Sequence, residues 1–249
     1  MITLLRNATL LVELGGMRLL VDPALDPAGA RPPVGNTPFP RPNPLVELPP
    51  EADAALEDLD GAIVTHLHRD HFDDAAGERL APGLPLLCQP PDTETLRDRG
   101  FADVRPVEAD AELGGVAVRR TPARHCLEPE IERGLGPVSG FVLRADGQGV
   151  YVASDSVWCD EVAGVLERER PDVVVVNSGA ARFLTGGPIS MTADDVIAVA
   201  RALPEARVVA VHLEALNHCP LTRVELADAV RAARVEVLIP ADGERIALS

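Results

Sequence analysis

Residues 61–71 read Gly-Ala-Ile-Val-Thr-His-Leu-His-Arg-Asp-His, a short apolar run followed at once by three histidines and an aspartate. The run 61–65 is typical of a buried strand, and residues 72–80 have helical character. The polar cluster therefore stands at a junction between a strand and a helix. Three of the six histidines of the chain fall in this one segment, which chance clustering does not readily explain.

The side chains of His66, His68, Asp70 and His71 can face one site. A strand alternates its side chains, and the turn after it brings neighbouring residues together. Imidazole nitrogens and a carboxylate are the ligands that zinc, iron or manganese take when one position must stay open for catalysis. The alternative is a solvated polar turn in which Asp70 or Asp73 caps the helix. We expect a metal site.

Apolar runs on both sides of this segment predict further strands and helices. Residues 9–13 and 17–21 form a predicted hairpin around Gly15-Gly16 that ends at Asp22-Pro23. Further strands are expected at 84–88, 116–120, 141–143, 149–153, 172–176, 207–211 and 235–239, and helices at 160–168, 192–203 and 222–233. In the last helix Thr222 and Glu225 match a capping box.

The order of these elements favours two sheets covered by helices, an α/β (α+β) fold with an αββα arrangement. Strands dominate the first half, helices alternate with strands in the second, and no GxGxxG follows the first strand as a Rossmann fold would require. No linker-like break interrupts residues 1–249, so we expect a single domain. Residues 23–50 are rich in proline and glycine and predict a long irregular loop, of the kind that serves as a lid or binding loop.

Composition limits the classes of function. The chain has 249 residues, of which 46% are apolar and 25% charged, as in ordinary globular proteins. The four cysteines form no CxxC pair, so we expect buried thiols rather than a zinc knuckle or a redox dithiol. No basic leader and no apolar stretch approaching ~18 residues is present, which predicts a cytoplasmic protein without a membrane partner.

Charge excludes further mechanisms. All 23 basic residues are arginine, so no lysine Schiff base, P-loop lysine or Ser-Lys dyad can operate. The formal charge of −16 counts against a nucleic-acid partner, because phosphate backbones are bound through basic surfaces.

The segment His66-Leu67-His68-Arg69-Asp70-His71 matches the HxHxDH signature of the metallo-β-lactamase superfamily. Four more residues match that family in order, each after a predicted strand: Asp22, His125, Asp155 and His212. The chain therefore resembles this superfamily over almost its whole length. The resemblance implies a four-layer αββα sandwich and a metal-dependent hydrolase.

The resemblance also implies which metal ion each site residue would bind. His66, His68 and His125 would bind one metal ion, Asp70, His71 and His212 would bind a second, and Asp155 would bridge the two. Asp22 would orient the ligand loop through hydrogen bonds, although an aspartate before a proline can equally be a turn former. Zinc is the expected metal, with manganese or iron as alternatives. Asp70 would also align the bridging hydroxide for attack.

Within the superfamily, the segment 150–156, the proline-rich loop and Asn177-Ser178-Gly179 look most like the ascorbate-6-phosphate lactonase branch. This predicts cleavage of an ester, lactone or phosphodiester bond in a small molecule, and an anionic substrate is one option. True β-lactamases are generally secreted, and the missing leader disfavours antibiotic hydrolysis. An iron-dependent, persulfide dioxygenase-like enzyme and a non-catalytic metal-binding protein remain alternatives. The diiron oxygen-reductase branch usually has a glutamate where this chain has His68, which argues against that version of the redox alternative. The sequence leaves the oligomeric state undecided, and a homo-oligomer is one option.

Several residues near the motifs have two interpretations. His218, six residues after His212, could donate a proton to a leaving group, bind substrate or be a core histidine, and Glu214 and Asn217 share that ambiguity. Cys126 and Cys219 are adjacent to histidines, but we expect them to pack in the core. An anionic substrate group could be clamped by an arginine, although a surface position is expected for each candidate: Arg41, Arg124 and Arg182.

Overall fold

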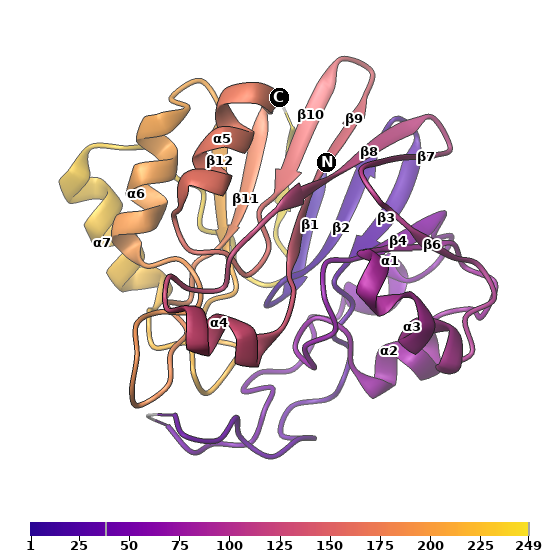
Figure 1. Ribbon diagram of the computed structural model, residues 1–249, viewed down its shortest axis with the longest axis horizontal. Helices are drawn as coiled ribbons and strands as arrows, with labels where there is room; N and C mark the ends of the chain where they lie inside the picture. The colour runs from indigo at the N-terminus through magenta and orange to yellow at the C-terminus, as the bar shows by residue number, and fades with distance from the viewer. Residues whose placement is uncertain (38, 249) are drawn as a thin grey trace.

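Two β-sheets pack face to face, and helices cover the outer side of each (Figure 1). The structure, a computed structural model, describes residues 1–37 and 39–248. One sheet has the strand order β13-β1-β2-β3-β4-β5-β6 and the other the order β12-β11-β10-β9-β8-β7. The predicted αββα sandwich is thereby confirmed.

The first sheet changes from antiparallel to parallel pairing at β3. It contains β1 (Ile2–Arg6), β2 (Thr9–Leu14), β3 (Met17–Val21), β4 (Gly61–Val64), β5 (Leu86–Cys88), β6 (Val104–Pro106) and β13 (Arg245–Ile246). The strands β13, β1, β2 and β3 pair antiparallel, whereas β3, β4, β5 and β6 pair parallel. The carboxyl ends of β3 and β4 consequently lie at the same edge.

The second sheet also combines both kinds of pairing. It contains β7 (Asp110–Leu113), β8 (Val116–Pro122), β9 (Ser139–Ala145), β10 (Gln148–Val152), β11 (Val173–Asn177) and β12 (Arg207–Val211). An antiparallel meander runs from β7 to β10, and β10, β11 and β12 are parallel. The strands β8, β10 and β12 therefore all run in one direction, and their carboxyl ends share one edge.

Helices form the outer layers. Helices α1 (Ala52–Ala55), α2 (Asp74–Arg79) and α3 (Thr93–Asp98), with the short 3-10 helix η1 (Pro90–Asp92), lie beside the first sheet, and α5 (Asp160–Glu169), α6 (Ala193–Ala202) and α7 (Arg223–Ala233) lie beside the second. Helix α4 (Pro129–Leu135) has no buried residue and lies at one end of the sandwich. Within the described residues, no helix is long and apolar enough to cross a membrane.

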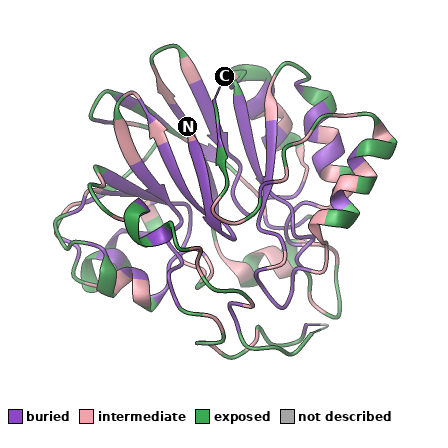
Figure 2. Cartoon of the chain, turned by 180° about the vertical axis from the view of Figure 1, so that it is seen from behind, coloured by how far each residue is buried: buried purple, intermediate pink, exposed green. Residues whose placement is uncertain are grey.

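Three apolar layers hold the sandwich together. The central layer lies between the sheets and includes Ile63, Phe141 and Val209, and one further layer lies under each group of helices. Figure 2 shows the result, with buried strands and exposed outer helix faces. Gly61 is needed at the start of β4, because a Cβ there would come within 2.5 Å of Leu113 Cδ2 and 3.1 Å of the Pro85 carbonyl. The close approach of the two sheets at this point excludes a side chain.

Most of the predicted elements are present. The hairpin at Gly15-Gly16 and the Thr222–Glu225 capping box are confirmed, and a second capping box joins Thr192 to Asp195. The helix predicted from residue 72 begins at Asp74 because the side chain of Asp73 caps it by accepting a hydrogen bond from Ala76 N. Residues 23–37 and 39–50 contain no helix and no named strand, and their only bridge joins Arg31 to Asn43.

The strand predicted over 235–239 is wrong. The segment forms a single bridge, between Val209 and Leu238, with two backbone hydrogen bonds of 2.8 Å each. Its valines are half-buried and alternate with exposed residues, which is the pattern that suggested a strand. Alternation reflects only an extended segment with one packed face, and this segment meets the edge of β12 at one point instead of running along it.

Candidate metal centre

The edge shared by both sheets carries all the predicted ligands. The strands β3, β4, β8, β10 and β12 end just before Asp22, His66, His125, Asp155 and His212, respectively. Three residues on this edge, Asp22, Ser154 and His212, have positive φ angles of 46°, 58° and 66°. Such backbone costs about 1–3 kcal/mol per residue and is commonly found at functional sites. It turns each chain sharply as it leaves its strand.

His66, His68 and His125 form one group of side chains whose ligand atoms lie within 4.8 Å of one another. His66 Nε2 is 2.9 Å from His68 Nδ1. The ring of His125 faces both, with centroid distances of 5.1 Å to His66 and 4.9 Å to His68. Three imidazoles converging in this way match a three-nitrogen metal site.

Asp70, His71, Asp155 and His212 form a second such group. His212 Nε2 lies 3.3 Å from Asp70 Oδ2 and 3.5 Å from Asp155 Oδ1. His71 Nε2 lies 3.8 Å from Asp70 Oδ2 and 3.3 Å from Asp155 Oδ2. This group offers two imidazole nitrogens and two carboxylates.

Asp155 lies between the two groups. Its Oδ2 is 4.0 Å from His66 Nε2 in the first group and 3.3 Å from His71 Nε2 in the second. Its Oδ1 also accepts a 2.7 Å hydrogen bond from Asn177 Nδ2, which fixes the rotation of the carboxylate. A carboxylate held in this position can contact a cation in either group.

Asp22 and Thr65 contact the outer ring nitrogens of two histidines of the site. Asp22 Oδ2 accepts a 2.8 Å hydrogen bond from His71 Nδ1 and another of 2.8 Å from the Thr65 hydroxyl. The Thr65 oxygen lies 3.0 Å from His66 Nδ1 and also accepts a bond from Ser154 Oγ. Since the hydroxyl proton of Thr65 is given to Asp22, its oxygen can accept the proton of His66. One carboxylate thus contacts His71 directly and His66 through Thr65, which is the arrangement that an outer partner of metal ligands would have.

The remaining ligands have partners that the sequence did not reveal. The carbonyl of Leu135, at the end of α4, lies 2.8 Å from His68 Nε2. A carbonyl can only accept, so the proton of His68 is on Nε2 and Nδ1 is free to bind a cation. His212 Nδ1 lies 3.4 Å from Cys219 Sγ, and Asn7 Nδ2 donates a 2.9 Å bond to the carbonyl of Asp70.

Charge differs between the two groups. Burial lowers the pKa of His125 to about 4, and burial together with His71 and His68 lowers the pKa of His66. Burial also lowers the pKa of His71, but Asp155, Asp22 and Asp70 outweigh it and raise that pKa to about 10. His66 and His125 therefore present neutral nitrogen lone pairs, whereas the carboxylates of the second group attract positive charge.

The donor set fits divalent cations. His71 Nε2 and both ring nitrogens of His125 are buried without any hydrogen-bond partner among the described residues. For His66, His68, His71 and His212, one ring nitrogen has an outer partner and the other points into the cluster. Unpaired buried polar atoms are costly, and a bound cation would satisfy them. The assignment of these seven residues as ligands, and of Asp22 as their support, stays a prediction.

Three ambiguous residues near β12 have different environments. His218 is buried, its Nδ1 lacks a partner in the described chain, and burial lowers its pKa. Glu214 instead pairs with Arg223 at 2.7 Å and so holds the start of α7. Asn217 holds the proline-rich loop, with its side chain bonded to Val34, Thr37, Phe39 and Asn43.

The arginines that could bind an anionic substrate group and the two cysteines next to histidines occupy surface and packing positions. Arg124 forms two 2.9 Å hydrogen bonds to Glu132, and the side chains of Arg41 and Arg182 are exposed. Cys126 packs in a small apolar cluster with Ala181 and Ile189. Cys219 belongs to the same cluster but also contacts His212, a contact that adjacency in sequence alone could not show.

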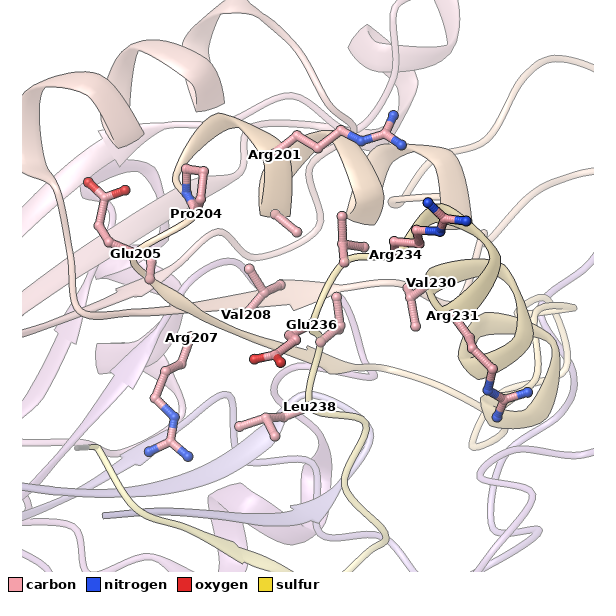
Figure 3. Close-up of a pocket in the computed structure, with 14 residues that line it drawn as sticks. Arg201, Pro204, Glu205, Arg207, Val208, Val230, Arg231, Arg234, Glu236 and Leu238 are labelled. Carbon is pink, nitrogen blue, oxygen red and sulfur yellow. The ribbon is translucent and has the colours of Figure 1, made fainter.

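A cavity of about 830 Å³ lies elsewhere, between α6, β12 and the segment after α7. Its arginines do not converge on one point, and Glu236 projects among its apolar residues (Figure 3). It contains none of the predicted ligands. The candidate site is therefore the sheet edge that carries the predicted histidine and aspartate ligands, and not this cavity.

Comparison with known proteins agrees with this geometry. The model of the beta-lactamase superfamily domain matches residues 17–213. The UPF0173 protein YddR of Bacillus subtilis is 34% identical over 98% of both chains. A UPF0173 metal-dependent hydrolase of Archaeoglobus fulgidus is 30% identical over 72% of this chain and 71% of its own.

Two solved structures superpose along nearly the whole chain. A possible metal-dependent hydrolase from Veillonella parvula has a TM-score of 0.94 at 31% identity, covering 98% of this chain and 97% of its own. An isothiocyanate hydrolase from Delia radicum gut bacteria has a TM-score of 0.92 at 33% identity, covering 99% and 98%. The likeness to the ascorbate-6-phosphate lactonase branch stays a prediction. The chain belongs to the beta-lactamase superfamily, within the UPF0173 family of metal-dependent hydrolases.

Proposed function

We propose that this protein hydrolyses a small molecule at a centre of two divalent metal ions, most simply zinc. The observation that carries the proposal is the position of Asp155, whose carboxylate lies 4.0 Å from His66 Nε2 and 3.3 Å from His71 Nε2. His66, His68 and His125 would hold one ion, and Asp70, His71 and His212 the other. All donors are nitrogen or oxygen, which suits zinc, manganese and iron.

Two bound cations would supply Lewis acidity and lower the pKa of water towards neutrality. The protein's own contribution is orientation. Asp22 and Thr65 fix the rings of His71 and His66, and the Leu135 carbonyl fixes His68. Ligands held in one rotamer keep the site geometry constant during the reaction.

Asp70 is the ligand that we expect to align the attacking water. Its side chain is 15% exposed, whereas those of His71, His212 and Asp155 are exposed by 0%, 0% and 6%. It is therefore the member of its group that faces the solvent side, where substrate arrives. A carboxylate there can accept a hydrogen bond from water and direct its lone pair towards an electrophilic atom.

His218 is the proposed donor to the leaving group. Burial lowers its pKa, so the ring is neutral at pH 7 and carries one N–H. The side chain is buried, and its Nδ1 has no hydrogen-bond partner among the described residues. A neutral imidazole in that place can donate a hydrogen bond to the departing atom.

For the substrate we propose an ester, a lactone or a phosphodiester, with an isothiocyanate as a second candidate. The isothiocyanate enters because the relative from Delia radicum gut bacteria, which is named for that activity, is 33% identical with a TM-score of 0.92. In each case water adds to an electrophilic carbon or phosphorus. An iron-dependent redox reaction and a purely metal-binding role would be distinguished by the experiment below.

The test combines metal analysis with a substrate panel. Protein purified without chelator should contain about two equivalents of metal per chain, and the wild type should hydrolyse at least one member of a panel of esters, lactones, phosphodiesters and isothiocyanates. Asp70→Ala should abolish this activity, whereas Asp74→Ala, the same change at an exposed residue of α2, should retain it.

Less than one equivalent of metal with no gain on adding zinc or manganese would contradict the proposal. Equal weak activity in Asp70→Ala and wild type would indicate a contaminant or a binding role. Oxygen uptake with thiol persulfides by iron-loaded protein would favour the redox alternative.

A further inference from the structure

Three large exposed apolar side chains lie on segments near the predicted metal centre. Phe39, Leu127 and Leu184 are 49%, 60% and 64% exposed. We call these three residues the apolar rim. They belong to three separate segments: the proline-rich loop, the turn two residues after His125, and the loop between β11 and α6. Large apolar side chains gathered in this way at a catalytic site are typical of a binding surface.

Hydrogen bonds join the three segments to one another. Leu184 N donates a 2.8 Å bond to the carbonyl of Asn36, three residues before Phe39. Gly187 N donates a 2.9 Å bond to Glu128 Oε1, next to Leu127. Figure 1 shows α4, the loop before α6 and the loop after β3 at the same end of the molecule. The three segments that carry the apolar rim are therefore neighbours at this end of the molecule.

An apolar cluster connects the apolar rim to the metal centre. Its buried members include Cys126, Ala181 and Cys219, and Ile131, Leu135 and Phe183 pack against it half-buried. Cys219 contacts the ligand His212, and the carbonyl of Leu135 bonds to the ligand His68. Cys126 and Phe183 of this cluster are the chain neighbours of Leu127 and Leu184, so the cluster lies between the predicted ligands and two of the three rim residues.

Two arginines near the rim are already paired. Arg124 is bound to Glu132 by two 2.9 Å bonds, and Arg31 pairs with Asp26 at 2.7 Å and donates to the Arg69 carbonyl. Arg41 and Arg182 are exposed to solvent. An anionic group bound by Arg31 or Arg124 would have to displace their present partners, whereas an apolar group on the rim would cover exposed apolar side chains.

From this arrangement we propose that the substrate carries an uncharged apolar substituent, of aryl or alkyl type, that packs on the apolar rim while its reactive group lies at the metal centre. The proposal rests on the proposed metal centre and narrows its substrate class. It adds Leu127 and Leu184 as residues that determine specificity. Burying an apolar group of two methylenes or more corresponds to a gain of about tenfold in affinity.

Two hydroxamates test this inference. Acetohydroxamate and 4-phenylbutanohydroxamate have the same metal-binding head and differ only in the apolar tail. Titration calorimetry with metal-loaded protein should show the phenylbutyl compound binding at least about tenfold more tightly. In Leu127→Ser and in Leu184→Ser this ratio should fall by about threefold or more. Val224→Ser on α7, where the side chain is 70% exposed, is the matched control and should leave the ratio unchanged.

A ratio near one in the wild type, or a ratio that neither rim substitution changes, would overturn the inference. So would light scattering that shows a wild-type dimer and a monomeric Leu184→Ser protein with an unchanged ratio, because the rim would then contact a second copy of the chain. A preserved tail preference without hydrolysis of any panel member would support this inference while the proposed hydrolysis fails. Hydrolysis without a tail preference would overturn this inference alone.

Discussion

Asp22 affects both groups of ligands through a single buried carboxylate. It accepts bonds of 2.8 Å from His71 Nδ1, the Thr65 hydroxyl and the Thr65 amide. Hydrogen bonds to a charged group contribute about 1.5–3 kcal/mol each, and outer partners of ligands change metal affinity by about 10- to 100-fold. Replacement should therefore affect stability and metal binding together.

We expect Asp22→Ala to lower metal affinity by at least about tenfold and the free energy of unfolding by about 3 kcal/mol. Competition with a chromogenic chelator and urea denaturation measure the two effects. Asp53→Ala, at a side chain that is 88% exposed, is the control. Unchanged metal affinity in Asp22→Ala would show that Asp22 is only a turn former.

Cys219 provides a second prediction at this scale. Its sulfur is the partner of His212 Nδ1 at 3.4 Å. Cys219→Ser keeps a polar atom there and should retain metal, whereas Cys219→Ala should weaken metal binding by about tenfold because the ring loses its outer partner. Metal content after dialysis distinguishes the two variants. Equal retention in both would mean that the thiol only fills space.

The His66–His71 cluster was visible from its spacing after an apolar run, and Asp22, His125, Asp155 and His212 became candidates through the resemblance to the metallo-β-lactamase superfamily, in which each matches a residue after a strand. Their outer partners were not predictable. The Leu135 carbonyl carries no signal in the sequence, since every residue has one. Thr65 contacts Asp22, and Asn177 contacts Asp155, so both act through contacts that exist only after β3 has paired with β4 and β10 with β11. Cys219 was expected to pack, and only the return of the chain after β12 brings it against His212.

At the scale of elements, one side chain makes many of the contacts that hold the proline-rich loop. Asn217 is buried, and its amide makes five hydrogen bonds to Val34, Thr37, Phe39 and Asn43. Its backbone N–H also donates a 2.9 Å bond to Asn43 Oδ1. The sequence predicted the loop but not its attachment, because the partners are separated by more than 170 residues.

Asn217→Ala should release this loop without removing the metal. We expect proteolytic cleavage within residues 31–42 to become faster by about tenfold, because local opening would cost about 1.4 kcal/mol less. Limited proteolysis followed by mass spectrometry measures this, with Thr185→Ala at an exposed loop position as control. Cleavage at the wild-type rate would show that other contacts hold the loop.

Short elements account for most of the differences between the predicted and observed fold. Strand β6 has three residues and β13 has two, which is too few for a periodic pattern. Strand β1 is buried at all five positions, so it lacks the alternation that marks a half-exposed strand. Segment 235–239 shows the reverse case, since it alternates but forms only one bridge.

At the scale of the whole molecule, the centre joins the two sheets. Asp22, His66 and His71 follow strands of the first sheet, and His125, Asp155 and His212 follow strands of the second. A cation bound by both sets would cross-link the halves of the sandwich. Because ligand binding to the folded state stabilises it by mass action, metal should raise the stability of the entire chain.

Removal of metal by a chelator should lower the melting temperature by several degrees, and added zinc should restore it. We further propose that both sheets unfold as one unit, so calorimetry should record a single transition with and without metal. A melting temperature that chelation does not change would contradict the cross-link. Two separated transitions would instead argue for two units.

The central claim is that two metal ions share the carboxylate of Asp155. Anomalous X-ray diffraction from crystals grown with zinc, recorded on both sides of the zinc absorption edge, tests it most directly. We predict two anomalous peaks about 3.5–4 Å apart, one beside His66, His68 and His125, the other beside Asp70, His71 and His212, with Asp155 between them. A single peak, or peaks away from these residues, would contradict the claim.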